Sequence, residues 1–583
     1  MKTIRFVYPY LKPHWRGYAL GLLLVPLSIA ASLSTPYLTG EAVATLQSPG
    51  GRTEDLYPTL AWILILSVVG GLSLFAVRYL LIGASRKMEF DLRNHVFRHL
   101  QSLDQIYFKN ARTGDIMARI TADVEGVRTL AGPVIMYTAR TIILLAVAIP
   151  LMASVSWLLT LCIMAPLSLL TLSVRKVGPR VHKAVARAQD VLSELSSSAQ
   201  ENFAGVRVVK SYAQEGAEIR TFGSVARRYL DRNLDVARIS ALMQPIIGGV
   251  GDVSLISLLF VGGMLLLQDK LELSDLIKFA GYQGSLLWPM ISIGWVANQF
   301  HRGTASIERI QAILSVEPRV KESASPLLPE SGAIEGSVSI RGLTFAYAPG
   351  PKPVLKDVSL EAPRGSTVAI VGRTGAGKST LVSLIARIYP VPDGAVFVDE
   401  IDVNRLPLSV LRRSIGFVPQ ESFLFSRTVS ENIAFGAEEW DLEEIYGVAE
   451  VTRFEKDIDQ LPRGYDELVG ERGVTLSGGQ KQRAAMARAL FVKPKILILD
   501  DALSAVDSQT ESEIVENLKR ATRGLTTIVV SHRLSSIRHA DRIYVLDGGR
   551  VAEEGTHAEL LERHGLYSDM YRLQLISDEL ERM

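Results

Sequence analysis

The chain has 583 residues and a net charge of +2, with 48% hydrophobic and 21% charged residues. It is too apolar for a disordered protein and too evenly charged for one that binds nucleic acid through a broad basic surface. Its one cysteine, Cys162, excludes an internal disulfide and a cysteine-rich metal site.

The apolar residues are concentrated in six nearly uncharged runs, all of which begin before residue 300. A helix needs about 20 apolar residues to cross the hydrocarbon core of a bilayer. We therefore predict six membrane spans rather than six buried core helices. The spans cover residues 17–40, 56–82, 132–154, 157–176, 244–267 and 277–299.

The segments between the spans predict the orientation of the chain in the membrane. Residues 86–128 and 175–238 are rich in Arg and Lys, as is the N-terminus, whereas residues 43–55 and 269–275 are short and nearly neutral or acidic. The positive-inside rule then places the long charged segments and both termini in the cytoplasm. The first span is too long for a cleavable signal, and a bacterial cytoplasmic membrane is the expected location.

The two long basic segments have the spacing of helices. Between residues 86 and 107, Met88, Leu92 and Val96 recur every four positions, which predicts that the membrane helices continue into the cytoplasm. Short turns near Gly114 and Gly205 would close these extensions.

The composition changes after residue 315. Residues 316–335 are polar and contain Pro, Ser and Glu, as in a linker, and β-rich runs then alternate with helical segments. This alternation predicts an α/β domain with a largely parallel sheet. We divide the chain into a transmembrane domain (1–315), a linker (316–335) and an α/β domain (336–583).

A phosphate-binding loop follows the first core strand of the α/β domain. Residues 372–379 read Gly-Arg-Thr-Gly-Ala-Gly-Lys-Ser between a strand and a helix, the context in which this pattern binds nucleoside triphosphate. Backbone N–H groups and the helix N-terminus would hold phosphate oxygens. Lys378 would reach the β- and γ-phosphates, Ser379 would ligate Mg²⁺, and Asp500, at the end of the strand ILILD, would supply a second metal contact.

Between these two elements the chain reads Leu-Ser-Gly-Gly-Gln at residues 476–480. With this pentapeptide about 20 residues before ILILDD, the domain resembles the ATPase of ATP-binding cassette (ABC) transporters, with a P-loop nucleotide-binding fold. The resemblance adds an adenine-stacking aromatic at Tyr347, a Q-loop at Gln420, a D-loop at Ser504–Asp507 and a switch histidine at His532. It implies that ATP and Mg²⁺ are the cofactors. The implied nucleotide contacts are Tyr347, Gly372, Thr374, Gly375, Gly377, Lys378, Ser379, Thr380, Ser477, Gly479 and Gln480. The implied metal contacts are Ser379, Gln420 and Asp500, and the implied catalytic residues are Asp501, His532 and Gln420.

The resemblance extends over nearly the whole chain. Residues 108–127 and 200–222 resemble the two cytoplasmic coupling regions of ABC exporters. Six spans followed by one cassette are similar to a half-transporter of the type IV exporter fold, which implies pairing with a second half-transporter. In the family each nucleotide lies between one chain's phosphate loop and the other's signature, so Ser477 and Gly479 would act on the partner's nucleotide.

One residue departs from the family pattern. The family has Glu directly after the strand-end Asp, where it positions the attacking water, and this chain has Asp501. The carboxylate is retained but drawn back by one methylene, and misplacement on this scale can cost about 100-fold in rate. The chain resembles the TmrB-type half of a bacterial heterodimeric multidrug exporter, which implies a degenerate site on its own phosphate loop. The alternative is a homodimeric exporter with slow ATPase activity.

The sequence restricts the substrate less than it restricts the ATPase. Arg78, Arg140 and Asp252 stand within or beside predicted spans, where charge usually faces a cavity or a partner, although Arg78 would also suit the membrane interface. Amphipathic drugs or peptides are the predicted substrates, membrane lipids surround the chain, and no nucleic acid partner is expected. A lipid flippase of the same fold is the alternative. Candidate cavity residues on the sixth span, for which packing is the competing interpretation, are Tyr282, Gln283, Trp288, Met290 and Trp295.

Overall fold

A computed structural model describes most of the chain, and its residues form two compact units. We call Met1–Gln101 with Thr113–Val316 the helical unit, and Ser102–Arg112 with Glu317–Met583 the sheet unit. Glu471 and Arg472, and Asp507 of the predicted D-loop, lie outside the described residues. The structure describes residues 2–48, 52–329, 332–348, 352–470, 473–506, 508–521 and 523–582.

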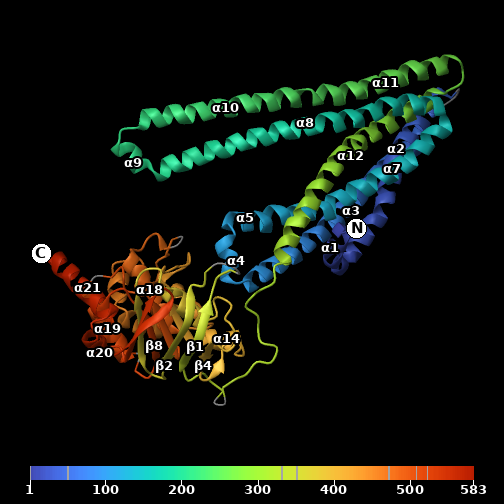
Figure 1. Ribbon diagram of the computed structural model, residues 1–583. Helices are drawn as coiled ribbons and strands as arrows, with labels where there is room; N and C mark the ends of the chain where they lie inside the picture. Colours follow the sequence, from blue (N-terminus) through green and yellow to red (C-terminus); the bar gives the residue numbers. More distant parts are fainter. Residues whose placement is uncertain are drawn as a thin grey trace. The chain divides into compact units, whose positions relative to one another are not determined.

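The helical unit contains long helices joined by short connections (Figure 1). Two π-helical segments, Arg119–Asp123 and Leu130–Val134, join α5, α6 and α7 end to end. Its helices are α1 (Lys2–Leu11), α2 (Trp15–Gln47), α3 (Leu56–Ser102), α5 (Thr113–Ala118), α6 (Val124–Thr129), α7 (Ile135–Val155), α8 (Trp157–Ala204), α9 (Val206–Ser211), α10 (Glu215–Ala241), α11 (Met243–Leu267) and α12 (Leu273–Leu314).

The six predicted spans fall within six of these helices: α2, α3, α7 with the π-helical segment before it, α8, α11 and α12. Among the described residues, four helical stretches are long and apolar enough to cross a membrane: Arg5–Gln47, Thr53–Ser102, Thr113–Val155 and Gly248–Leu267. Helix α8 carries a shorter apolar stretch, Trp157–Leu169. Helix α12 is less apolar because buried polar side chains, Lys278 and Gln283 among them, interrupt its apolar run.

The connections follow local chemistry. Ser156 separates α7 from α8, and its hydroxyl accepts a hydrogen bond from the Leu159 N–H at 3.4 Å, capping α8. Gly205 lies in the turn between α8 and α9, as predicted. Gly114 is the second residue of α5, just after the turn that follows Asn110.

Helices α8, α9, α10 and α11 form a long hairpin, in which α10 runs beside α8 (Figure 1). Val225 is the buried side chain among the described residues of α10. The apolar core of the helical unit lies among α2, α3, α7, α8, α11 and α12, and is built from side chains such as Leu81, Met152, Leu159 and Phe279.

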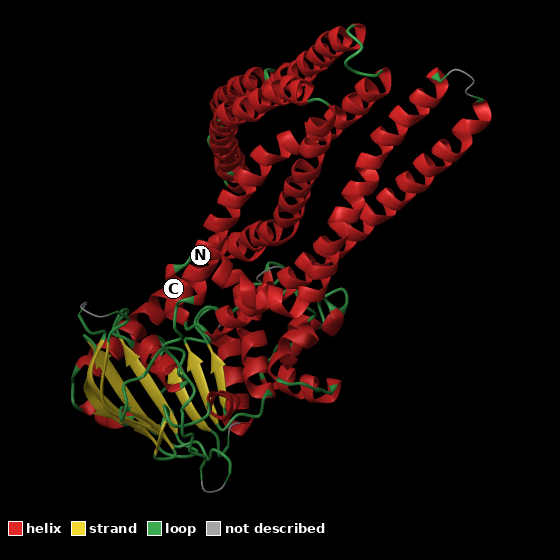
Figure 2. Ribbon diagram, turned by 90° about the vertical axis from the view of Figure 1, so that its right-hand side faces the viewer, coloured by secondary structure: helices red, strands yellow, loops and turns green. Residues whose placement is uncertain are grey.

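The sheet unit contains the described strands of the protein, drawn in yellow in Figure 2. One antiparallel sheet has the order β2-β1-β4-β5, and a larger sheet has the order β10-β9-β3-β8-β7-β6. In the larger sheet all neighbours except β10 and β9 are parallel, as predicted for an α/β domain. The strands are β1 (Val338–Phe345), β2 (Leu355–Ala362), β3 (Thr367–Gly372), β4 (Val396–Val398), β5 (Ile401–Asp402), β6 (Ile415–Val418), β7 (Ile496–Asp500), β8 (Thr526–Val530), β9 (Arg542–Asp547) and β10 (Arg550–Gly555).

Because β3, β6, β7 and β8 are parallel, the loops after these strands meet at one edge of the larger sheet. Two helices begin within functional motifs: α13 (Lys378–Ile385) at the end of the phosphate loop and α18 (Gly478–Phe491) inside the signature. A separate helical lobe with its own apolar core surrounds α18. That core includes Leu424, Ile433, Ile445, Phe454 and Phe491.

The sheet unit contains further helices, some of which belong to the lobe around α18. They are α4 (Gln105–Asn110), α14 (Leu408–Arg413), α15 (Val429–Ile433), α16 (Leu442–Val451), α17 (Glu455–Ile458), α19 (Ser508–Ala521), α20 (His557–Glu562) and α21 (Leu566–Arg582).

Candidate functional site

The phosphate loop connects β3 to α13. At two of its positions only glycine fits, because a Cβ atom would clash with neighbouring atoms. A Cβ on Gly372 would lie 2.1 Å from the Leu546 carbonyl oxygen of the neighbouring strand, and Gly372 has a φ of 148°. Gly377 has a φ of 100°, and a Cβ there would lie 2.7 Å from a Leu355 methyl carbon. The loop therefore presents bare backbone at the N-terminus of α13, where N–H groups can hold phosphate oxygens.

Lys378 is folded into this loop. It is 5% exposed, and its Nζ donates hydrogen bonds to the carbonyl oxygens of Gly372 at 2.8 Å and Arg373 at 3.1 Å. Burial lowers the pKa of the Lys378 ammonium, and the charges of Asp501 and Asp500 act in the opposite direction. The carbonyl oxygens hold the ammonium at the loop that phosphates would occupy.

Ser379 and Asp500 lie together at the end of β7. The Ser379 hydroxyl donates to Asp500 Oδ1 at 3.0 Å. Asp500 is 4% exposed, and burial raises the pKa of its carboxyl; the charge of Asp501 adds to this rise and the Ser379 hydrogen bond opposes it. A buried carboxylate beside a hydroxyl is a suitable oxygen pair for Mg²⁺, which usually takes one or two carboxylates and otherwise substrate phosphates and water.

Asp501 has a left-handed backbone, with a φ of 51°. Its N–H donates to the Val530 carbonyl at 2.9 Å, and its own carbonyl accepts from the Ser504 hydroxyl at 3.0 Å. These bonds fix the backbone on both sides of the residue, so the reach of the Asp501 carboxylate depends on its short side chain.

Gln420 and His532 complete the edge of the sheet. Gln420 lies two residues after β6 and His532 two residues after β8, and both side chains are exposed. Since β7 lies between β6 and β8, the structure brings both residues to the strand end that carries Asp500 and Asp501.

Tyr347 is held in place by neighbouring side chains. Its hydroxyl is hydrogen-bonded to the Thr380 hydroxyl of α13 at 2.7 Å. Its ring meets Phe345 and Tyr389 edge to face, with centroids 5.2 and 5.1 Å away. An aromatic ring fixed beside the phosphate loop is a stacking platform for a nucleobase.

The signature motif begins α18. The Ser477 hydroxyl accepts from the Gln480 N–H at 3.3 Å, and Gln480 Oε1 accepts from the Ser477 N–H at 2.8 Å, a reciprocal cap. A Cβ on Gly479 would lie 2.8 Å from the Ala505 carbonyl oxygen, so glycine lets the signature helix approach the D-loop. Ser477 is exposed, and among the described residues no hydrogen bond joins it to the phosphate loop.

Gln482 is a residue that sequence reasoning missed. Its amide donates to the Ser504 hydroxyl at 3.0 Å and accepts from the Ala505 N–H at 3.0 Å, tying α18 to the segment after Asp501. Its place two residues after the signature is a visible signal, but only the packing shows what it binds.

Family models match both units. The model for the ABC transporter transmembrane region matches residues 18–290, and the ABC transporter model matches residues 355–504. The chain is 34% identical over 572 residues to a probable multidrug resistance ABC transporter ATP-binding/permease protein, YheI, of Bacillus subtilis, covering 98% of this chain and 97% of that one. The chain belongs to the ABC transporter family.

Two further relatives have different names. The transporter is 35% identical over 575 residues to the multidrug resistance-like ATP-binding protein MdlA of Escherichia coli, covering 98% of this chain and 96% of MdlA. It is 31% identical over 565 residues to an ATP-dependent lipid A-core flippase of Chromohalobacter salexigens, covering 97% and 96% of the two chains.

The structure is also similar to that of a bacterial Atm1-family ABC exporter with ATP bound. The TM-score is 0.78 at 29% identity, covering 96% of this chain and 99% of that chain. The transporter is therefore a membrane-embedded half-transporter of the exporter fold, with a helical transmembrane region followed by an α/β nucleotide-binding ATPase domain.

The sheet unit of the transporter includes helix α4, which overlaps the start of the first predicted coupling region. Helix α4 is capped by Asp104, whose carboxylate accepts from the Ile106 N–H at 2.9 Å and from the Arg319 N–H at 3.3 Å. Ile106 packs against the apolar core of the sheet unit.

Lys109 of α4 reaches the stacking platform. Its Nζ lies 4.9 Å from the ring centroid of Tyr347 and 5.2 Å from that of Tyr389, which is the range of cation–π contacts. A hydrogen bond to Tyr389 raises the pKa of the Lys109 ammonium. Sequence reasoning missed this contact because residues 109 and 347 are far apart in the chain, and no local pattern links them.

The charged candidates of the helical unit have separate surroundings. Arg140 lines a cavity among α2, α3, α7 and α12. Asp252 is exposed, and no ion pair joins it to Arg140 in the described part of the chain. Arg78 is exposed in a groove that it shares with Arg16 and Arg86, which favours the interfacial interpretation of this residue.

The candidate cavity residues of α12 divide into packed and exposed side chains. Tyr282 and Met290 belong to the apolar core, and Gln283 is 7% exposed, with its amide donating to the Gly251 carbonyl at 3.3 Å. Trp288 and Trp295 are exposed. The cavity that Arg140 lines is contacted from α12 by a different residue, Ser285.

Proposed function

We propose that this transporter is one half of a heterodimeric ABC exporter that uses ATP to move amphipathic drugs or peptides across the bacterial cytoplasmic membrane. The named multidrug relatives and the exporter fold support this proposal. The proposed division is a transmembrane domain at 1–315, a linker at 316–335 and a nucleotide-binding domain at 336–583. The ATPase domain and both termini would face the cytoplasm, in agreement with the basic segments between the spans.

The roles proposed for the site follow its geometry. Tyr347 would stack on adenine, and the phosphate loop with Lys378 would hold the phosphates. When bound, Mg²⁺ would neutralise charge on the phosphates. Ser379, Asp500 and Gln420 would hold the ion, and the Ser379–Asp500 distance of 3.0 Å supports this use of their oxygens.

The single observation that carries the heterodimer proposal is Asp501. This carboxylate is about 1.5 Å shorter in reach than Glu, and its backbone is held at a φ of 51° by hydrogen bonds to Val530 and Ser504. The backbone therefore has little freedom to restore the missing length. We infer that Asp501, His532 and Gln420 form a slow site, while Ser477, Gly479 and Gln480 complete a fast site on the partner's phosphate loop.

The exposed tip of the α8–α10 hairpin supports pairing with a second half-transporter. ABC exporters of this fold act as dimers. The side chains of Val208 and Tyr212 at this tip are 61% and 73% exposed, and Phe203 is 77% exposed. Large apolar side chains clustered at a cytoplasmic tip indicate a surface that a partner covers.

ATPase measurements test the heterodimer. The chain purified alone, in nanodiscs, should hydrolyse ATP at least tenfold more slowly than the same chain purified with its partner half-transporter. Replacing Asp501→Glu should raise hydrolysis at the chain's own site, whereas Asp466→Glu, at an exposed position, serves as the matched control. Full turnover by the chain alone would support the homodimeric alternative, and an Asp501→Glu variant without gain would place the defect elsewhere.

A lipid flippase is the second candidate function, because one relative over nearly the full length is named as a lipid A-core flippase. Reconstituted vesicles distinguish the two functions. ATP-dependent uptake of a fluorescent drug or peptide supports the exporter, and ATP-dependent transfer of a labelled lipid between leaflets without drug uptake supports the flippase.

A further inference from the structure

The cavity around Arg140 has the size and lining of a site for a charged group. It has a volume of about 410 Å³ and lies among α2, α3, α7 and α12. Cavities of several hundred Å³ with a few polar groups are typical of small-molecule sites. This cavity lies within the membrane spans, apart from the ATP site.

Among the described residues, Arg140 is the only charged side chain in the lining, and its own surroundings do not neutralise it. Within the described part of the chain, no hydrogen bond or ion pair holds its guanidinium. The other side-chain cation that acts on it is Arg78, which has the same charge. A guanidinium inside a bilayer is costly unless a counter-charge or water compensates it.

Hydroxyl groups line the same cavity: Ser28, Ser32, Thr35, Ser67 and Ser285. The hydroxyls of Ser28, Thr35 and Ser285 donate to carbonyl oxygens of their own helices. The hydroxyls of Ser32 on α2 and Ser67 on α3 make no such bond among the described residues, so they can turn toward a ligand.

Gly71, four residues after Ser67 on α3, leaves room in the cavity because it has no side chain. Gly71 lines the cavity, and a Cβ built on it would meet no atom within 4 Å. The space at Gly71 is therefore open, which suits a headgroup larger than a single ion.

We propose that this cavity binds the anionic group of an amphiphilic substrate, a phosphate, sulfonate or carboxylate held by Arg140 with the Ser32 and Ser67 hydroxyls. A guanidinium forms paired hydrogen bonds with such groups. The inference rests on the proposed export function and narrows its substrate class to acidic amphiphiles. A lipid headgroup and a free acidic molecule share this chemistry.

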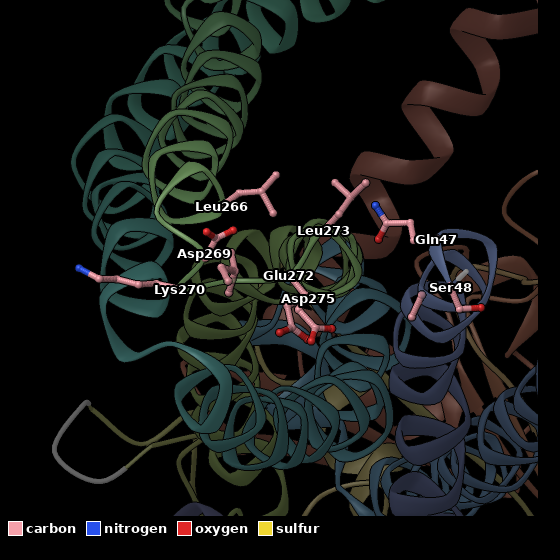
Figure 3. A pocket seen from close by; sticks show the side chains of 10 residues that line it. Gln47, Ser48, Leu266, Asp269, Lys270, Glu272, Leu273 and Asp275 are labelled. Carbon is pink, nitrogen blue, oxygen red and sulfur yellow. The ribbon is translucent and has the colours of Figure 1, made fainter. Parts of the chain in front are cut away.

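The outer connections of the bundle have the opposite charge. A second cavity of about 720 Å³ lies at the ends of α2 and α11 and the start of α12, and Figure 3 shows the carboxylates of Asp269, Glu272 and Asp275 at its wall, with Lys270 as the cation of the lining. An anion held at Arg140 would meet a net negative wall at these outer connections. Repulsion by these carboxylates would favour release of the anionic substrate at the outer connections.

Transport by the wild-type complex in inside-out proteoliposomes tests the proposal. One arm measures ATP-dependent uptake of radiolabelled taurocholate, a free acidic amphiphile, against tetraphenylphosphonium, a cationic one. A second arm measures leaflet transfer of fluorescent phosphatidylglycerol against fluorescent phosphatidylcholine. Preference for taurocholate over the cation would identify a free acidic molecule as the substrate. Preference for phosphatidylglycerol over phosphatidylcholine would identify an anionic lipid.

Arg140→Gln should lower transport of the preferred anion by about tenfold or more, because a hydrogen bond to a charged group is lost. Arg140→Lys should restore part of the loss. The control Arg227→Gln removes an exposed cytoplasmic arginine and should leave anion transport unchanged. Gly71→Leu should also block the anion by filling the cavity, whereas Gly83→Leu, at an open position on the same helix, should not.

The outcomes separate this inference from the proposed function. An Arg140→Gln variant that loses anion and cation transport equally would indicate a structural ion pair across the dimer and would overturn the proposal. Wild-type transport of the cation alone, unaffected by Arg140→Gln, would also overturn it and leave the exporter intact. A complex that moves none of the four probes with ATP would instead contradict the export function.

Discussion

The two coupling regions of this transporter use their apolar residues in different ways. Helix α4, which overlaps the start of the first predicted region, belongs to the sheet unit, with Ile106 packed on its core and Lys109 over Tyr347. Helix α9 of the second region leaves Val208 61% exposed. Helix α4 therefore finds its packing within one chain, whereas Val208 of α9 stays largely uncovered among the described residues. The ATP site divides in the same way, since Lys378 of the phosphate loop is buried while the signature residue Ser477 is exposed.

The exposed signature carries the largest predicted effect. Ser477→Arg should lower ATP hydrolysis of the assembled dimer by about 100-fold or more, because a lost transition-state donor in such sites costs that much. Photolabelling with azido-ATP should show that nucleotide binding to the chain's own phosphate loop is retained. If labelling and hydrolysis were lost together, Ser477 would act on the nucleotide of its own phosphate loop. The signature and the phosphate loop would then not differ in their need for a partner.

A change at the exposed tip of the α8–α10 hairpin should have the second-largest effect. Val208→Asp places a charge on a surface that a partner would bury, and should lower substrate-stimulated ATPase activity by about tenfold. Basal hydrolysis should remain, because the site itself is unchanged. Ser224→Asp, on an exposed part of α10, is the matched control; equal losses in both variants would argue against a covered tip.

Loss of the contact between helix α4 and Tyr347 should have a smaller effect on ATPase activity. Lys109→Met removes the cation over Tyr347 and should reduce the ratio of stimulated to basal ATPase by about threefold, the size expected of an exposed cation–π contact. The loss should add only partly to that of Tyr389→Leu, since Lys109 also lies over the Tyr389 ring and both changes break this second contact. Additive losses would indicate that the two residues act separately.

The smallest effect concerns stability. Burial raises the pKa of Asp500 in the folded protein, so the folded state loses stability as the pH rises through this raised value. Asp500→Asn removes that loss and should raise the melting temperature of the nucleotide-free protein at neutral pH by roughly 2–4 °C.

The gain from Asp500→Asn should shrink as the pH falls toward the ordinary range of an aspartate, where the wild-type carboxyl is protonated in both states. Differential scanning fluorimetry across this range measures the trend. A gain that stays constant with pH would show that the carboxylate is not the source of the cost.

Much of the architecture could be predicted from local patterns. Uncharged runs long enough to span a bilayer predicted the membrane helices, and each predicted span lies within a helix. The glycines of residues 372–377 predicted a bare backbone turn, and a Cβ at Gly372 or Gly377 would clash with a neighbouring strand. Short sequence patterns predict these features because bilayer thickness and backbone geometry constrain residues that are close together in the chain.

Other features depend on segments that are far apart in the chain. The contact of Lys109 with Tyr347 joins residues more than 200 positions apart, and Asp501 is held by a carbonyl of the next strand. The sequence showed that Arg140 is a charge in the membrane, but helix packing placed it in a cavity rather than against Asp252. Motifs report local chemistry, whereas the partners of a side chain follow from how distant segments pack.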